Sequence, residues 1–302
     1  MLRSMYSGIS GLRNFQTKLD VIGNNIANVN TYGFKKGRVI FKDLISQTVA
    51  GASGGNNTLG GVNPKQVGLG SQISAIDTIH TGGSTQFTGN ILDLAISGDG
   101  FFQVAEGPKQ GGAPTGFNDI SYTRAGNFYM DNQGYLVDSS GKYLVGVAGV
   151  PTNEEYPTAG TLTYDTEDRV NETETIQYQP IVVPTTAQSM SISQDGTVTF
   201  VDAEGTLRWA GQLEIAKFPN PAGLQKVGGN YFQSTANSGT PVKNVATTAG
   251  LGSIESGFLE MSNVDLAEEF TEMIVAQRGF QANTRIITTS DEILQELVNL
   301  KR

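Results

Sequence analysis

Matching heptad patterns at the two ends of the chain constrain its fold more than any other feature. Two apolar series with seven-residue spacing run through the N-terminal segment: Met5, Leu12, Leu19 and Ile26, and Phe15, Ile22 and Val29. A third series runs through the C-terminal segment: Leu259, Leu266, Met273, Phe280, Ile287 and Leu294. This spacing places apolar side chains on one face of a helix. Because neither helix can bury its own stripe, we expect the two helices to pair.

The N-terminal helix is predicted to be unstable alone. Four asparagines crowd its C-terminal part: Asn24, Asn25, Asn28 and Asn30. Their amides compete for nearby backbone groups and disfavour a helix. The helix therefore needs tertiary or subunit contacts to form.

The faces opposite these stripes are polar but carry few charges. They include Asn24, Asn28, Gln277, Gln281, Asn283, Thr284 and Thr288. One interpretation is that the stripes form the ordinary core of a single domain. The other is that these faces bond to further copies of the chain. On the second interpretation, the subunit-interface residues are Leu12, Phe15, Leu19, Ile22, Asn24, Asn25, Ile26, Asn28, Val29, Leu266, Phe270, Met273, Gln277, Phe280, Asn283, Ile287 and Leu294.

The region between the two stripes is predicted to be β-structure. From Ile73 onward, short apolar segments alternate with turns rich in Gly, Asn and Asp, which tolerate positive φ. Examples of these turns are 98–100, 131–134, 139–141 and 195–196. The fold class is therefore α+β, with paired long terminal helices in an inner, coiled-coil-like domain and an elongated, mainly β outer domain.

Composition changes along the chain predict the domain boundaries. Residues 50–70 are rich in Gly, Asn and Ser and are expected to form a flexible loop or extended arm. We expect a terminal helical domain from 1–32 with 260–302, a linking arm at 33–75, and a β-rich domain at 76–259. An acidic excursion is expected at about 148–184, because residues 151–180 hold seven acids and one base.

Charge and composition exclude several functions. The net charge of −9 gives no basic surface for nucleic acid. The chain has no cysteine, and its single histidine, His80, leaves no set of residues for a metal site or a catalytic triad. We expect no enzyme activity, no cofactor and no metal. No apolar run approaches the roughly 18 residues of a membrane span, so we expect no membrane insertion, and residues 1–11 lack the apolar core of a cleaved signal peptide.

Three stretches resemble the rod and hook proteins of the bacterial flagellum. They are LDVIGNNIANVNTYGFKK at 19–36, LDLAISGDGFFQV at 92–104 with YTRAGNFYMDNQGYLVD at 122–138, and SNVDLAEEFTEMIVAQRGFQANTRIITTSDEILQELVNL at 262–300. For residues of about 146–186 we place no such resemblance. The resemblance implies an inner tube of terminal helices, a β-rich outer layer, and type III export to the cell exterior without signal cleavage.

Within this family, the TYGFK turn, VGLGSQ at 67–72 and LDLAIS at 92–97 are most similar to short hook proteins of Gram-positive type. The resemblance then implies a bendable tubular joint that transmits torque from rod to filament around the export channel. The implied partners are other copies of the chain, adjacent rod and hook–filament junction proteins, the hook cap and the export apparatus. The alternative is a distal rod subunit forming a rigid drive shaft, favoured by the chain length and by the loop at about 46–66.

Two interpretations from other classes stay open at this point. A glycan hydrolase on a β-scaffold would need a convergent pair of carboxylates, and none can be named from the sequence. A fibre module that trimerises through coiled coils would use the same stripes in a closed assembly. Mass measurement distinguishes a closed trimer from an open-ended polymer.

Overall fold

The fold is described from a computed structural model. It covers residues 2–55, 60–107, 109–110, 113–114, 119–148 and 179–300. The chain divides into two compact units, each made of segments that are distant in sequence. The helical unit comprises Met1–Val29, Lys36–Ile79 and Val264–Arg302, and the β unit comprises Asn30–Lys35 and His80–Asn263.

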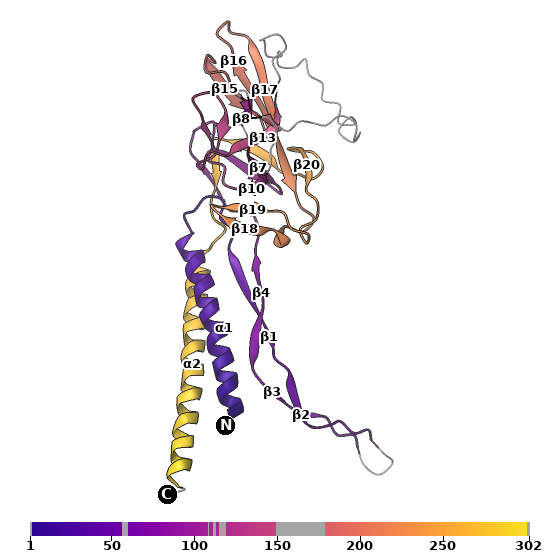
Figure 1. The fold of residues 1–302 in the computed structure, drawn as a ribbon, viewed down its shortest axis with the longest axis vertical. Coiled ribbons are helices and arrows are strands. Elements are labelled where there is room, and N and C mark those ends of the chain that lie inside the picture. Colours follow the sequence, from indigo (N-terminus) through magenta and orange to yellow (C-terminus); the bar gives the residue numbers. More distant parts are fainter. Residues whose placement is uncertain are drawn as a thin grey trace. The chain divides into compact units, whose positions relative to one another are not determined.

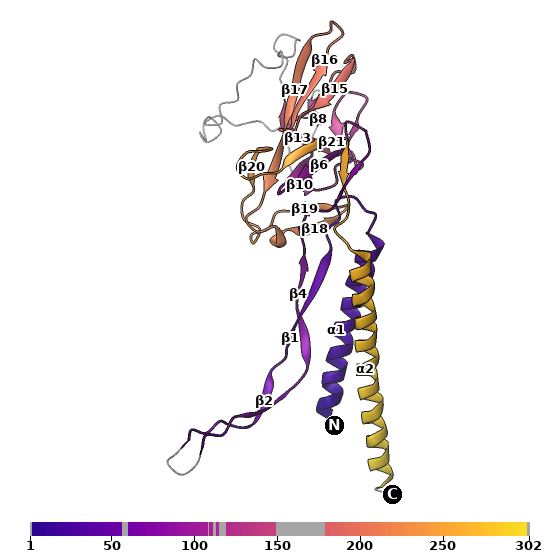
Figure 2. The same cartoon turned by 180° about the vertical axis from the view of Figure 1, so that it is seen from behind.

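The helical unit contains two long helices and a β-ribbon. Helices α1 (Leu2–Ala27) and α2 (Leu266–Asn299) lie side by side in both Figure 1 and Figure 2. The α+β class and the two terminal helices predicted from the sequence are thus confirmed. At about 1.5 Å per residue, α2 is roughly 50 Å long and α1 roughly 40 Å.

Helix α2 begins at a well-formed cap. The Asp265 carboxylate accepts hydrogen bonds from the backbone N–H groups of Ala267 (2.8 Å) and Glu268 (3.4 Å). Glu268 and Glu269 occupy the first turn, where the helix dipole favours acids. The start of this helix is therefore encoded locally.

The ribbon consists of two antiparallel pairs. Strand β1 (Gly37–Asp43) pairs with β4 (Ser71–Thr78), and β2 (Ser46–Ala50) pairs with β3 (Lys65–Gly68). Of the two alternatives for residues 50–70, a flexible loop or an extended arm, the loop does not describe residues 65–68, which form strand β3. Every residue of β2 and β3 is exposed, so their sequences carry no alternation of apolar and polar residues that would indicate a strand.

The β unit is built around a 12-stranded sheet. Its order runs β11-β12-β13-β17-β7-β10-β19-β18, and β14, β15, β16 and β20 pair beside this path. The strands of the unit are β5 (Thr85–Phe87), β6 (Leu94–Ser97), β7 (Phe101–Glu106), β8 (Lys109–Gln110), β9 (Ala113–Pro114), β10 (Asp119–Thr123), β11 (Tyr129–Met130), β12 (Leu136–Val137), β13 (Tyr143–Ala148), β14 (Gln179–Pro180), β15 (Ser189–Ile192), β16 (Thr197–Val201), β17 (Leu207–Lys217), β18 (Gln225–Gly228), β19 (Tyr231–Gln233), β20 (Val242–Val245), β21 (Ser253–Ser256) and β22 (Phe258–Glu260). A short 3₁₀ helix, η2, spans Pro221–Gly223.

The core of the β unit forms where strands β6, β7, β13 and β17 bring their apolar residues together. Phe102, Leu144 and Ile215 are among its fully buried members. The turns predicted from Gly-rich sequence are present: Gly98 and Gly100 have φ of 116° and 140°. These are left-handed or extended-positive conformations that glycine adopts without steric cost.

One sequence prediction on the β unit is wrong, and another lies mainly outside the described residues. Leu259, placed in the C-terminal helical series, is a buried residue of strand β22, which pairs with β5. The acidic excursion at about 148–184 falls mainly on residues 149–178, outside the described residues. Among the helices of the described ranges, none is both long and apolar enough to cross a lipid bilayer.

Candidate subunit interface

The two helices meet along a seam of small and polar residues. On α1 the face toward α2 includes Gly8, Gly11, Phe15, Lys18, Ile22 and Asn25. Phe15 and Ile22 belong to a predicted series, and Gly8 lies seven residues before Phe15. The companion series is 11, 18 and 25, however, one residue earlier than the predicted 12, 19 and 26. The change follows from the ribbon, since α1 also packs against β1 and β4.

Glycines let the two helices approach closely. A Cβ built on Gly279 would lie 2.5 Å from the ring of Phe15, and one on Gly11 would lie 2.9 Å from the Asn283 amide. Both distances are shorter than real carbon contacts, so neither position accepts a larger residue without movement. Asn283, predicted on the face opposite the seam, therefore lies in the seam.

Most of the large apolar side chains of α2 remain exposed. The described part of α2 exposes Leu266, Phe270, Ile274, Val275, Phe280, Ile286, Ile293, Leu297 and Val298. Ile274 is 59% exposed and Phe270 50% exposed. Apolar surface on this scale is typical of interaction sites rather than of free monomers. The helix therefore carries far more apolar surface than α1 covers.

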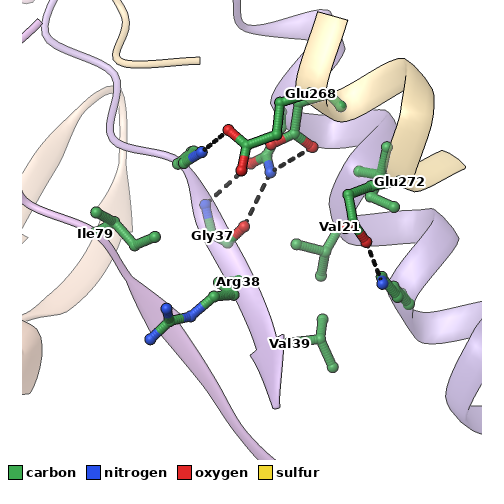
Figure 3. A pocket seen from close by; sticks show the side chains of 12 residues that line it. Val21, Gly37, Arg38, Val39, Ile79, Glu268 and Glu272 are labelled. Carbon is green, nitrogen blue, oxygen red and sulfur yellow. Dashed lines mark hydrogen bonds and ion pairs between the residues drawn. The ribbon is translucent and has the colours of Figure 1, made fainter. Parts of the chain in front are cut away.

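A cavity of about 320 Å³ lies between α1, α2 and β1 within the helical unit (Figure 3). Ion pairs bridge its walls: Lys18 pairs with Glu272, and Lys36 with Glu268 at 2.6 Å. Val21, Val39 and Ile79 provide apolar lining. The mixture of charged rim and apolar wall suits a side chain from another protein chain better than a cofactor.

Asn25 holds the three elements around this cavity together. Its amide Nδ2 donates to the Gly37 carbonyl at 2.9 Å and to Glu269 Oε2 at 3.1 Å, and the Gly37 N–H donates to Asn25 Oδ1 at 3.0 Å. The side chain is 2% exposed. Asn25 is thus bonded within its own chain, a role that the sequence alone did not indicate.

The predicted interface residues fall into three groups in the structure. Ile22 and Asn25 are buried. The exposed members are Asn24, Leu266, Phe270, Gln277 and Phe280. The half-buried members are Leu12, Phe15, Leu19, Ile26, Asn28, Val29, Met273, Asn283, Ile287 and Leu294. Asn28 Nδ2 donates to Asn24 Oδ1 at 2.6 Å, so these two amides are bonded to each other.

The β unit contains a buried ionic cluster that sequence reasoning missed. Glu260 accepts hydrogen bonds from Lys35 Nζ at 2.6 Å, the Gly83 N–H at 2.9 Å and Arg124 Nη1 at 3.2 Å. Lys35, Arg124 and Glu260 are each less than 5% exposed. Burial lowers the pKa of Lys35, while Glu260 acts in the opposite direction. The cluster ties the Asn30–Lys35 segment to strand β22.

Within the ranges that the structure describes, no group of three or more His, Cys, Asp or Glu residues could hold a metal ion. The candidate site consists of the exposed apolar side chains of α2 and the cavity beside them, a candidate surface for association. Its chemistry is apolar burial, amide hydrogen bonding and ion pairing.

Three sequence-family models match the chain. Residues 5–35 match "Flagella basal body rod protein", residues 95–200 match "Flagellar hook protein FlgE/F/G D1 domain", and residues 255–300 match "Flagellar basal body rod FlgEFG protein C-terminal". The matches cover both terminal helices and much of the β unit.

Full-length relatives carry rod and hook names. The chain is 54% identical to "Flagellar basal-body rod protein FlgG" of Bacillus subtilis over 303 residues, covering both chains completely. It is 38% identical to the FlgG protein of Borreliella burgdorferi over 305 residues and 33% identical to the "Flagellar hook protein FlgE" of that organism over 451 residues, again with complete coverage.

Alignment length separates these relatives. The two FlgG alignments are within a few positions of the 302 residues of this chain, so almost nothing is inserted or deleted. The FlgE alignment has 451 positions, so this chain has gaps at well over a hundred of them. The relatives thus favour the rod assignment, ranked second on sequence, over the hook assignment ranked first.

Proposed function

Because this chain belongs to the family of flagellar basal-body rod and hook proteins, we propose that it is a subunit of the distal rod. In this role it polymerises into a rigid tubular drive shaft in the basal body of the bacterial flagellum. Its 54% identity to a full-length basal-body rod protein, without insertions, supports the rod over the hook.

The exposed apolar side chains of α2, which lie on both sides of its buried residues, are the observation that carries this proposal. Nine large apolar residues on one helix lack sufficient cover from α1. In a tube of identical subunits, these side chains would contact a different surface on the neighbouring copy, a heterologous contact that extends without closing. Burying them would stabilise the polymer at roughly 25 cal/mol per Å² of apolar area.

In the polymer, the terminal helices would form a coiled-coil-like inner layer around the export channel. The ribbon, the central part of the expected 33–75 arm, would link this layer to the β-rich outer layer. In the same role we propose export through the type III apparatus, contacts with adjacent rod and junction proteins, and a location outside the cell membrane. The named relatives are structural proteins, which agrees with a role without catalysis.

Complementation distinguishes rod from hook. The chain is expressed in Bacillus subtilis strains that lack either their own FlgG protein or their own hook protein, and basal bodies are imaged by electron microscopy. We expect completed rods and restored motility only in the first strain. Rescue of the second strain alone would overturn the rod proposal in favour of the hook.

A matched pair of substitutions tests the interface itself. Ile274→Ser removes an apolar side chain that is 59% exposed on α2, and Val227→Ser removes one that is 60% exposed on β18 of the β unit. We expect Ile274→Ser to reduce sedimentable polymer strongly, while Val227→Ser assembles like the wild type. Circular dichroism checks that both monomers are folded. Equal assembly of the two variants would show that α2 is not the polymer contact.

A further inference from the structure

The cavity between α1, α2 and β1 contains a carboxylate that no cation of the cavity pairs with. The three cations that line it, Lys18, Lys36 and Arg38, each form an ion pair with an acid other than Glu269. Glu269 also lines the cavity, and none of the described residues forms an ion pair with it. The cavity and its ion pairs therefore carry one uncompensated negative charge.

Only one oxygen of the Glu269 carboxylate is hydrogen-bonded. The residue is 6% exposed, and its Oε2 accepts a hydrogen bond from Asn25 Nδ2 at 3.1 Å. Its Oε1 accepts none from the part of the chain that the structure describes, yet it is not one of the fully enclosed atoms that lack a partner. Oε1 is thus accessible to an incoming group. Because a charge largely withdrawn from water is costly unless it is paired, a cation beside Oε1 would be stabilising.

The rest of the lining suits a long basic side chain. Val21, Val39 and Ile79 give the cavity apolar walls (Figure 3). Lysine and arginine bury an aliphatic stem along such surfaces while the charged end reaches a carboxylate, and the guanidinium fork matches carboxylate geometry best. Glu268 and Glu272 at the rim are exposed, so a side chain can enter from solvent.

Arg278 of α2 has the complementary need. It is exposed, and it forms no ion pair with any described residue. Ile274 and Val275, which precede it by about one helical turn, are 59% and 54% exposed. Arg278 therefore lies among the apolar side chains that the polymer is proposed to bury. A guanidinium buried there requires a carboxylate on the partner.

Arg278 and Glu269 cannot meet within one chain. They are nine residues apart on the same helix, so at 3.6 residues per turn they point to opposite sides, roughly 14 Å apart along the axis. A contact that extends without closing needs two different surfaces on every copy. An acid and a base on opposite sides of α2 provide such a pair of surfaces.

We propose that the Arg278 guanidinium of one copy enters this cavity in a second copy and pairs with the Glu269 carboxylate. The apolar walls of the cavity cover the stem of the arginine, and Ile274 and Val275 contact the surface around the rim. The choice of a second copy rests on the proposed polymer. The inference adds which two surfaces of the helical unit meet.

The absence of cysteine from the sequence makes a cross-linking test direct. One protein carries Arg278→Cys, and a second, differently tagged protein carries Arg38→Cys at the cavity rim, where the side chain is 61% exposed. The two are assembled together at high concentration and treated with a short bis-maleimide. We expect a cross-linked heterodimer. In the control, Arg13→Cys on the exposed side of α1 replaces Arg278→Cys and should give none. Equal cross-linking from both positions would overturn the inference.

A double-mutant cycle tests the ion pair itself. Arg278→Gln and Glu269→Gln should each raise the critical concentration for assembly about tenfold, and the double variant should raise it no further than either single change. Glutamine keeps an oxygen that accepts from Asn25, and circular dichroism checks the fold. Arg285→Gln removes another exposed arginine of α2 and should assemble like the wild type. Losses that multiply in the double variant would overturn the pairing.

The two experiments separate this inference from the proposed function. Wild-type polymer that forms without the Arg278 cross-link, or with multiplying losses in the cycle, would exclude the pairing and leave the rod proposal intact. If the wild type forms neither polymer nor cross-linked pairs, both proposals fail.

Discussion

Glu260 is a buried carboxylate that bonds several donors within the β unit. Its one carboxylate serves two buried cations and a backbone N–H. Removing one partner of a buried ion pair leaves the other charge unpaired in a low-dielectric environment, which costs about 3–5 kcal/mol. Substitution of Glu260 is therefore expected to lower the stability of the β unit.

Glu260→Gln should lower the free energy of unfolding of the β unit by about 3–5 kcal/mol. The measurement is urea unfolding followed by fluorescence of Trp209, the only tryptophan and a buried residue of β17. Asp99→Asn is the matched control, since it removes a carboxylate paired with Lys217 at the surface and should cost less than about 1 kcal/mol. Similar losses in both variants would contradict the importance of burial.

His80 should make the β unit less stable in mild acid. Its folded pKa of about 4 lies below the unfolded value of about 6.5, so the unfolded state binds the proton more readily. Its contribution is zero above about pH 6.5 and becomes unfavourable by about 3 kcal/mol as the pH falls to about 4. The His80→Gln variant should lose less stability than the wild type across this window, measured by the same fluorescence. Parallel curves would show that His80 titrates normally.

The sequence could not reveal these residues. Lys35 and Lys36 are neighbours in one basic cluster, yet Lys35 is buried on Glu260 while Lys36 pairs at the surface with Glu268. The partner of Lys35 is 225 positions away. No local pattern distinguishes the two lysines, because only the folded β unit brings Glu260 beside one of them.

Both helices could be predicted from the sequence. The residues at which they contact each other could be predicted only in part. Heptad spacing identified both helices and the series of α1 that contains Phe15 and Ile22, because apolar periodicity is a local property. It placed the second series at 12, 19 and 26, whereas residues 11, 18 and 25 face α2, because α1 also packs against the ribbon. It also assigned Leu266 and Phe280 to the seam, although both are exposed and it is Gly279 that lies against Phe15 of α1.

Gly279→Ala should destabilise the helical unit even though alanine is the better helix former. Phe15 would have to move from the added methyl, but its ring is already 6.1 Å from that of Phe41. Overpacking typically costs about 1–3 kcal/mol, more than the propensity gain of about 1 kcal/mol. Gly23→Ala is the control, because nothing lies within 4 Å of its added carbon, and it should stabilise α1. Thermal loss of the helical circular dichroism signal measures both.

At the scale of the whole chain, local turn chemistry predicted the β unit well. The turns expected at 98–100, 131–134, 139–141 and 195–196 lie between β6 and β7, β11 and β12, β12 and β13, and β15 and β16. Local turn chemistry could not predict which segments belong to the helical unit and which to the β unit. The short segment Asn30–Lys35 joins the β unit through the Gly33 N–H to the Glu260 carbonyl and Asn230 Nδ2 to the Tyr32 carbonyl, contacts between distant parts of the sequence.

The exposed apolar side chains of α2 have a thermal consequence. Burial of apolar surface is driven by entropy near room temperature and weakens on cooling, with a negative heat-capacity change. A polymer held together by these side chains should therefore be cold-labile, with a higher critical concentration at about 5 °C than at about 35 °C. Pelleting over a range of protein concentrations measures it, and Ile274→Ser should flatten the temperature dependence. A critical concentration that falls on cooling would mean that polar contacts, rather than these side chains, dominate the free energy of assembly.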